Sequence, residues 1–264
     1  GTVCANTAGP GRLRYGGIRD FLIAIQFVDG TGQILRGGAK VVKNAAGFDF
    51  PKFFVGSMGR FGVLTEVSFK VFPTPPSWLT LRIPCETATV AIERVRIAAS
   101  SRWECDALEY IPRDAAVFIR LGGPATALAE LASEIERHWP GVTRLTEEDA
   151  RAFWAFHREQ QWANAAAVLV KVPTSLSVIP QLEAALPALH GASAGYSAAG
   201  NVAYIALTAP SQFSGLEKAL QSLGLCGLTM RGMNSPLWLG PATSTKIAPD
   251  IKRVFDPAGR FLPL

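Results

Sequence analysis

The sequence has few of the residues that build metal centres and disulfide frameworks. Its 264 residues include only four cysteines and three histidines. The cysteines form no C-x-x-C pair and have no histidine near them in the chain; they are Cys4, Cys85, Cys105 and Cys226. The spacing of metal ligands is therefore missing. We expect no metal site, and free thiols in a reducing cytoplasm.

Long apolar runs and a signal-like N-terminus are absent as well. No apolar run approaches the roughly 20 residues that a membrane helix needs, so we expect no membrane span. The start, Gly1 to Asn6, has no Met, no basic region and no apolar region, so we expect no signal peptide there. We therefore expect the chain to begin inside a longer, cytoplasmic protein. Tight Lys/Arg runs interleaved with aromatic residues are also missing, which argues against a nucleic-acid partner.

The composition itself is that of a globular protein, with 48% hydrophobic and 18% charged residues. The formal net charge is +5. Residues 1–72 hold nine basic and four acidic side chains, whereas the remainder holds 17 of each sign. The whole excess thus lies in the first quarter of the chain. It favours a small polyanion, such as a phosphate-bearing cofactor, over a merely solvated basic face.

The first 72 residues predict short strands separated by glycine. Residues 21–28 alternate loosely and end at Asp29-Gly30, a strong hairpin signal, and residues 33–36 can form the returning strand. Residues 47–54 predict a short helix and residues 62–72 a long strand. Three prolines between residues 72 and 77 then indicate a linker.

After the linker, the same order of elements occurs twice. Strands are expected at 78–83, 107–111, 117–121 and 142–145, with helices at 86–99 and 124–138. A second round has strands at 167–172, 194–198, 202–208 and 225–230, with helices at 178–189 and 213–223. Each round is β-α-β-β-α-β, the ferredoxin-like unit. A charged, aromatic helix lies between the rounds at 147–162.

These patterns predict an α+β protein in which two ferredoxin-like units form one broad antiparallel sheet with helices on one face. We expect three parts. Residues 1–73 form the first domain, residues 74–232 the second, and residues 233–264 a tail that returns toward the first.

Two glycine-rich segments stand out in the first domain. Residues 1–11 are built from small residues that let backbone N–H groups approach an anion. They match neither the Rossmann G-x-G-x-x-G nor the P-loop. The second segment runs from Gly56 to Gly62 and leads into a strand. Either segment alone could be an ordinary turn.

Together with their flanks, the two segments resemble the FAD-binding domain of the vanillyl-alcohol oxidase/PCMH-type flavoproteins. The motifs are Gly1-Thr2, Asn6-Thr7-Ala8-Gly9, Tyr15-Gly16-Gly17-Ile18-Arg19-Asp20, Lys43 to Asp49 and Gly56 to Glu66. Within that superfamily the sequence is most similar to the FAD-binding subunits of bacterial glycolate oxidases. Residues 251–261 resemble the closing motif of that family. The resemblance implies the second lobe of an FAD-binding domain, followed by a cap domain with a large antiparallel sheet.

The resemblance also implies the residues of a flavin site. Carried over motif by motif, the cofactor-binding residues are Gly1, Thr2, Asn6, Ala8, Gly9, Tyr15, Gly16, Gly62, Val63 and Leu64. Arg231 resembles a family arginine and is our candidate for an anionic substrate, although a surface or salt-bridged arginine is the alternative. Tyr15 and Asp49 can equally be turn residues that connect loops.

Three departures from the family pattern shape the functional expectation. The family's other FAD-binding lobe would precede Gly1, so we expect these residues alone to be inactive and to bind FAD weakly or not at all. His138, His157 and His190 form neither H-x-H nor a Glu-His pair, so the family's histidine metal site is not expected. Leu262 stands where the family more often has Asn.

The resemblance implies an FAD-binding subunit of a glycolate oxidase-type complex that oxidises a small 2-hydroxy acid. A sister flavoprotein subunit and an iron–sulfur subunit would be its partners, and the complex could lie peripherally at the inner membrane. One alternative is a non-catalytic interaction subunit with a vestigial flavin site. Another is a flavin dehydrogenase of the same fold that acts on lactate or a sugar acid.

Overall fold

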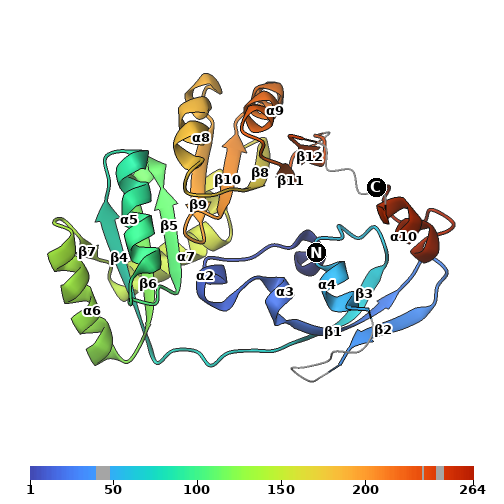
Figure 1. The fold of residues 1–264 in the computed structure, drawn as a ribbon, viewed down its shortest axis with the longest axis horizontal. Coiled ribbons are helices and arrows are strands. Elements are labelled where there is room, and N and C mark those ends of the chain that lie inside the picture. Colours follow the sequence, from blue (N-terminus) through green and yellow to red (C-terminus); the bar gives the residue numbers. More distant parts are fainter. Residues whose placement is uncertain (40–47, 234, 242–246) are drawn as a thin grey trace. The chain divides into compact units, whose positions relative to one another are not determined.

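The computed structural model describes residues 1–39, 48–233, 235–241 and 247–264. They divide into two compact units (Figure 1). The first holds residues 1–8, 15–74 and the described C-terminal segment, and the second holds residues 9–14 and those from Pro75 to 241. Residues 43–47 of the family-like motif lie outside the described residues. Our division of the chain at residues 73 and 232 stays a prediction.

The first unit has a three-stranded antiparallel sheet with strand order β2-β1-β3. Its elements are α1 (Thr2–Ala5), α3 (Ile18–Phe21), β1 (Leu22–Val28), β2 (Ile34–Gly38), α4 (Phe50–Phe54), β3 (Val63–Phe69) and α10 (Ile247–Phe255). Helix α2 (Arg12–Tyr15) begins in the second unit and ends in the first. The Asp29-Gly30 turn between β1 and β2 is confirmed. Its Asp29 carboxylate accepts hydrogen bonds from the backbone N–H groups of Thr31 and Gln33.

The core of the first unit is aromatic, and the C-terminal segment closes it. Phe27 and Phe54 are fully buried, with ring centroids 4.4 Å apart. Phe255 of α10 packs against Phe27, and its carbonyl accepts the N–H of Gly30 at 2.7 Å. Gly38 is required where β2 meets β1, because a Cβ there would collide with the Ile23 carbonyl.

Asp256 holds the end of the chain in place. Its carboxylate accepts hydrogen bonds from the backbone N–H groups of Arg260 and Phe261, and from Lys252 Nζ. Burial raises the pKa of this carboxyl, but the hydrogen bonds from Lys252 and from the two N–H groups outweigh burial and lower the pKa to about 2. The family-like closing motif therefore has a structural role, because the hydrogen bonds of Asp256 fix the conformation of the last residues.

The second unit is built on a nine-stranded antiparallel sheet with strand order β12-β11-β8-β10-β9-β5-β6-β4-β7. The first round is β4 (Ser77–Pro84), α5 (Ala88–Ser100), β5 (Ala107–Ile111), β6 (Ala116–Gly123), α6 (Ala125–His138) and β7 (Thr143–Arg144). The second is β8 (Val168–Pro173), α8 (Ile179–Ala185), β9 (Ser193–Ser197), β10 (Val202–Leu207), α9 (Phe213–Ser222) and β11 (Gly227–Arg231), followed by β12 (Trp238–Leu239). Each round has the strand order of a ferredoxin-like unit. The expected tandem is confirmed.

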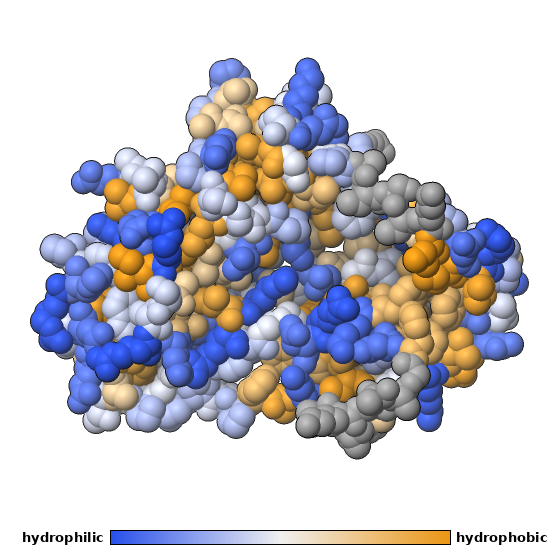
Figure 2. All heavy atoms as spheres, in the orientation of Figure 1, coloured by the Kyte–Doolittle hydropathy of each residue, from blue (hydrophilic) through white to orange (hydrophobic). Residues whose placement is uncertain are grey.

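The helices cover both faces of this sheet, which corrects the expectation of helices on one face. Helices α5, α6, α8 and α9 bury apolar residues on one face, and Figure 2 shows hydrophobic surface between α8 and α9. Helix α7 (Glu147–Arg158) and the short 3-10 helix η2 (Gln161–Ala163) pack on the opposite face. There, Trp154 of α7 belongs to one buried apolar cluster with Phe118 and Ala107. Within the described residues, no helix has the length and apolar character needed to cross a membrane.

Candidate functional site

The two glycine-rich segments of the first unit lie side by side. The N–H of Gly56 donates to the Val3 carbonyl at 3.2 Å, and the N–H of Met58 donates to the Cys4 carbonyl at 2.9 Å. Asn6 ends α1 in the left-handed conformation, with φ 50°. The structure thus brings together two segments that are far apart in the sequence. They form one surface made mostly of small residues and backbone.

This surface has open backbone and unsatisfied polar atoms. A Cβ added at Gly1 or Gly59 would have no atom within 4 Å. Ser57 Oγ and Arg60 Nε are buried, and among the described residues neither has a hydrogen-bond partner. Burial lowers the pKa of Arg60. A buried donor without a partner is costly, so a hydroxyl and a guanidinium of this kind fit an anion such as the diphosphate of FAD.

The other residues of the predicted flavin site are spread over both units. Tyr15 lies against Phe72, with ring centroids 5.3 Å apart in the first unit. Gly9 belongs to the second unit, where a Cβ would lie 3.5 Å from Arg158 Cγ. Gly62 packs closely on β1, since a Cβ would lie 2.8 Å from the Val28 carbonyl.

The remaining predicted residues occupy short elements and turns of the first unit. Thr2 opens α1, and its carbonyl accepts the backbone N–H of Thr7 at 3.2 Å. Gly16 has a φ of 87°, a conformation that favours glycine. Ala8 ends the first segment of the unit, and Val63 and Leu64 begin β3. All ten assignments to the cofactor stay predictions.

Arg231 and the histidines have structural contacts in the second unit. Arg231 donates through Nη2 to the Ala163 carbonyl of η2. His157 is buried against Phe153, and burial lowers its pKa to about 4. No group of three or more His, Cys, Asp or Glu suited to a metal ion occurs in the described part of the chain. The substrate assignment of Arg231 stays a prediction.

The second unit carries a buried lysine that the sequence patterns did not indicate. Lys171 of β8 lies directly opposite Tyr204 of β10 in the antiparallel register. Lys171 is only 6% exposed. Burial and the nearby charge of Arg12 lower its pKa to about 8. Its one sequence signal is a lysine in an otherwise apolar strand.

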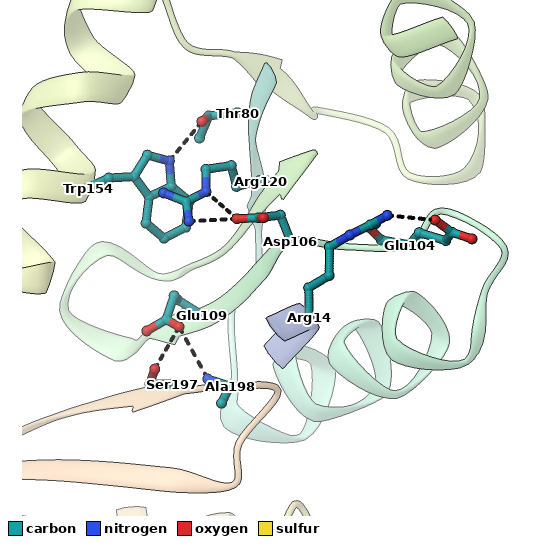
Figure 3. Close-up of polar contacts among 9 residues, drawn as sticks. All are labelled: Arg14, Thr80, Glu104, Asp106, Glu109, Arg120, Trp154, Ser197 and Ala198. Atoms are coloured by element: carbon teal, nitrogen blue, oxygen red, sulfur yellow. Dashed lines mark hydrogen bonds and ion pairs between the residues drawn. The ribbon is translucent and has the colours of Figure 1, made fainter. Parts of the chain in front are cut away.

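Glu109 of β5 is a second buried ionisable group on the same sheet face. Its Oε1 accepts hydrogen bonds from Ser197 Oγ at 2.8 Å and from the N–H of Ala198 at 3.2 Å (Figure 3). Burial raises its pKa to about 8, although both hydrogen bonds and the charge of Arg120 oppose the rise. Glu109 is therefore a neutral acid at pH 7. Nothing in its own strand, Ala107–Ile111, pointed to these distant partners.

Comparison with known proteins gives relatives over part of the chain. No family model matches it. The chain is 35% identical over 164 residues to the glycolate oxidase subunit GlcE of Escherichia coli (strain K12), covering 61% of this chain and 43% of that protein. It is 31% identical to the glycolate oxidase subunit GlcD of Bacillus subtilis (strain 168), covering 56% and 32% of the two chains.

A third relative is a D-lactate dehydrogenase of Anaerostipes hadrus, 33% identical over 43% of this chain and 24% of that protein. This chain therefore spans less than half the length of each of the three relatives. Among solved structures, an alkyldihydroxyacetonephosphate synthase superimposes with a TM-score of 0.63 at 13% identity. That likeness covers 98% of this chain and 56% of the synthase, and it shows a shared fold.

Proposed function

Because this chain is a member of the FAD-linked oxidase family, whose cofactor is FAD, we propose that it takes part in flavin-dependent oxidation of a small 2-hydroxy acid. Its role is that of an FAD-binding subunit of a glycolate oxidase-type complex. A sister flavoprotein subunit and an iron–sulfur subunit are its proposed partners. The similarity to two glycolate oxidase subunits is the observation that carries the proposal.

The paired glycine-rich segments are the proposed site for the FAD diphosphate. Ser57 and Arg60 bind it through the two polar atoms that have no partner among the described residues. Open backbone at Gly1 and Gly59 admits the phosphates without a steric clash. When bound, FAD supplies the acceptor for the two electrons of the oxidation.

The second unit is proposed to bind the substrate carboxylate. Burial and the charge of a second cation, Arg12, both lower the pKa of Lys171. A carboxylate placed near both would relieve their repulsion, because opposite charges attract strongly where burial has removed water. Lys171 must be protonated for this, so carboxylate binding is strong below pH 8 and is lost as the pH rises through about 8.

FAD binding is tested by titrating the chain into FAD and following flavin fluorescence and visible absorbance. We expect weak but saturable binding, and Arg60→Gln should weaken it about tenfold further, the effect of losing one charge-assisted hydrogen bond of about 1.4 kcal/mol. Arg36→Gln is the matched control, because Arg36 is an arginine of the same unit whose Nε donates to Gln26 instead. Equal FAD affinity of Arg60→Gln and the unchanged chain would refute the proposed diphosphate site.

Substrate class is tested separately, by thermal stabilisation with glycolate, D-lactate and the neutral analogue glycolamide. We expect stabilisation by a 2-hydroxy acid at pH 7, little at pH 9.5, and none with glycolamide or in Lys171→Met. A preference for D-lactate would favour the lactate dehydrogenase alternative, which the third relative supports. FAD binding without any response to 2-hydroxy acids would favour the non-catalytic subunit.

A further inference from the structure

A cavity of the second unit lies away from Lys171, the residue proposed to bind the substrate carboxylate. Its volume is about 570 Å³, within the range of small-molecule sites. Strand β4, strand β6 and helix α7 enclose it, with Trp78, Thr80, Arg120, Arg151, Trp154 and Arg158 among its lining residues. In the strand order, β5, β9 and β10 separate β6 from β8, the strand of Lys171. The cavity is therefore distinct from the proposed substrate site.

Arg120 forms a rigid cationic wall of this cavity. Its Nε and Nη2 contact Oδ2 of Asp106 at 2.7 and 2.6 Å, and Asp106 is fully buried (Figure 3). The guanidinium carbon lies 4.8 Å from the Trp78 ring centroid and 4.9 Å from that of Trp154. Cation–π contacts of this kind attract the guanidinium to both indole rings. The guanidinium is thus fixed by three side chains before any ligand arrives.

One wall of this cavity is the Trp154 indole, and a buried hydroxyl fixes its orientation. Trp154 is 6% exposed, and its Nε1 donates to Thr80 Oγ1 at 2.8 Å, which sets the orientation of the indole. Thr80 is itself 2% exposed. Ala150 and Leu145 add apolar surface to the lining. Such walls suit a flat apolar body better than a compact inorganic ion.

The electrostatics of the lining favour an anion. Within the described residues, the only hydrogen-bond partner of the Arg120 guanidinium is Asp106, so its Nη1 edge remains available, and the side chain is 21% exposed. Arg151 and Arg158 stand at the rim in exposed pairs with Glu147 and Glu159. Exposed pairs of this type contribute little, so both arginines can turn to a ligand. The lining has three arginines and one glutamate.

We propose that this cavity binds a small organic carboxylate with a planar apolar body. The carboxylate contacts the outer edge of Arg120, with Arg151 and Arg158 completing its neutralisation. The apolar body packs against the indoles of Trp78 and Trp154. This ligand is separate from the 2-hydroxy acid of the proposed function, and its site lies entirely in the second unit.

The test is isothermal titration of the chain with benzoate, with its neutral isostere benzamide and with acetate. We expect one equivalent of benzoate to bind saturably, with benzamide and acetate each at least tenfold weaker. Benzamide tests the charge, and acetate tests the apolar body. Equal binding of benzoate and benzamide, or no saturable benzoate binding, would overturn the proposal.

Charge-reversal variants at the rim locate the binding without threatening the fold. Arg151→Glu and Arg158→Glu change side chains that are 77% and 60% exposed. Each should weaken benzoate at least tenfold while leaving the unfolding midpoint nearly unchanged. The matched control is Arg96→Glu on α5, an exposed arginine that also pairs with a glutamate of its own helix. If Arg96→Glu weakens benzoate as much as Arg151→Glu does, general charge attraction explains the binding and this cavity does not.

Discussion

Replacing Glu109 with Gln should change how the stability of the second unit depends on pH. Glu109 is 5% exposed, and its pKa is raised from 4.5 to about 8. Gln has nearly the same shape, and its carbonyl oxygen can accept the same hydrogen bonds from Ser197 and Ala198. Unlike Glu, it cannot ionise in the unfolded chain.

The size of the effect follows from proton linkage. Between pH 4.5 and 8, the folded chain keeps the proton of Glu109 while the unfolded chain releases it. Stability therefore falls as the pH rises through this window, by about 1.36 kcal/mol per unit once the unfolded carboxyl is ionised. From pH 5 to pH 7 the free energy of unfolding of the unchanged chain should fall by about 2.5 kcal/mol through Glu109, and Glu109→Gln should not show this fall.

Intrinsic fluorescence is a suitable assay, because all six tryptophans lie in the second unit. Urea unfolding at pH 5, 6 and 7 gives the free energy of unfolding for both proteins. The informative quantity is the difference between them at each pH, which cancels the other titrating groups. A lower free energy of unfolding in the variant, by the same amount at every pH, would not affect the reasoning. Parallel profiles, with a difference that does not change from pH 5 to 7, would refute it.

Three further predictions concern stability. Arg120→Ala should lower the free energy of unfolding by about 3–5 kcal/mol, because it leaves the buried Asp106 carboxylate unpaired; urea unfolding measures this, and Arg120→Met with Asp106→Asn should recover most of the loss. Gly38→Ala should destabilise the first unit by more than about 1 kcal/mol, through its φ of 78° and the clash with the Ile23 carbonyl; Gly32→Ala is the control, since it has a similar φ and no close neighbour. Asp256→Asn should lower the stability of the folded chain above pH 4, and this contribution of the Asp256 carboxylate is lost as the pH falls toward 2. The midpoint of thermal unfolding, followed by circular dichroism, should therefore differ less between the variant and the unchanged chain at pH 3 than at pH 7.

The architecture of the second unit was predictable because its patterns are local. Apolar strands such as Ala107–Ile111 are buried along their whole length, and Pro124 precedes a helix that begins within a residue of the expected position. The order of these elements determines a ferredoxin-like topology once each round is identified. The family resemblance read from the glycine-rich segments is confirmed by the relatives.

The side of the sheet covered by α7 was not predictable in the same way. Ala150, Phe153 and Trp154 make an apolar stripe at i, i+3, i+4 spacing that would suit either sheet face. Tertiary contacts select the face: the Trp154 indole N–H donates a hydrogen bond to Thr80, and the indole ring contacts the Arg120 guanidinium. Each of these partners lies on a different strand. Periodicity alone carries no information about such contacts.

The candidate site shows the same division between local and distant signals. The small residues of 1–11 and 56–62 were visible as motifs, whereas the buried state of Ser57 Oγ and Arg60 Nε depends on how the segments pack. Lys171 and Arg12 lie far apart in the sequence, and Glu109 meets Ser197 across 88 positions. Groups whose pKa depends on burial become apparent only in three dimensions.

The ends of the nine-stranded sheet bear on how the protein behaves in concentrated solution. Either ferredoxin-like half alone would present β5 or β9 as a bare strand of five residues, with unpaired N–H and C=O groups open to another chain. Joining the halves pairs β5 with β9. The outermost strands, β12 and β7, are only two residues long. A sheet that tapers in this way offers neighbouring copies little backbone to extend, and so resists edge-to-edge aggregation despite its width.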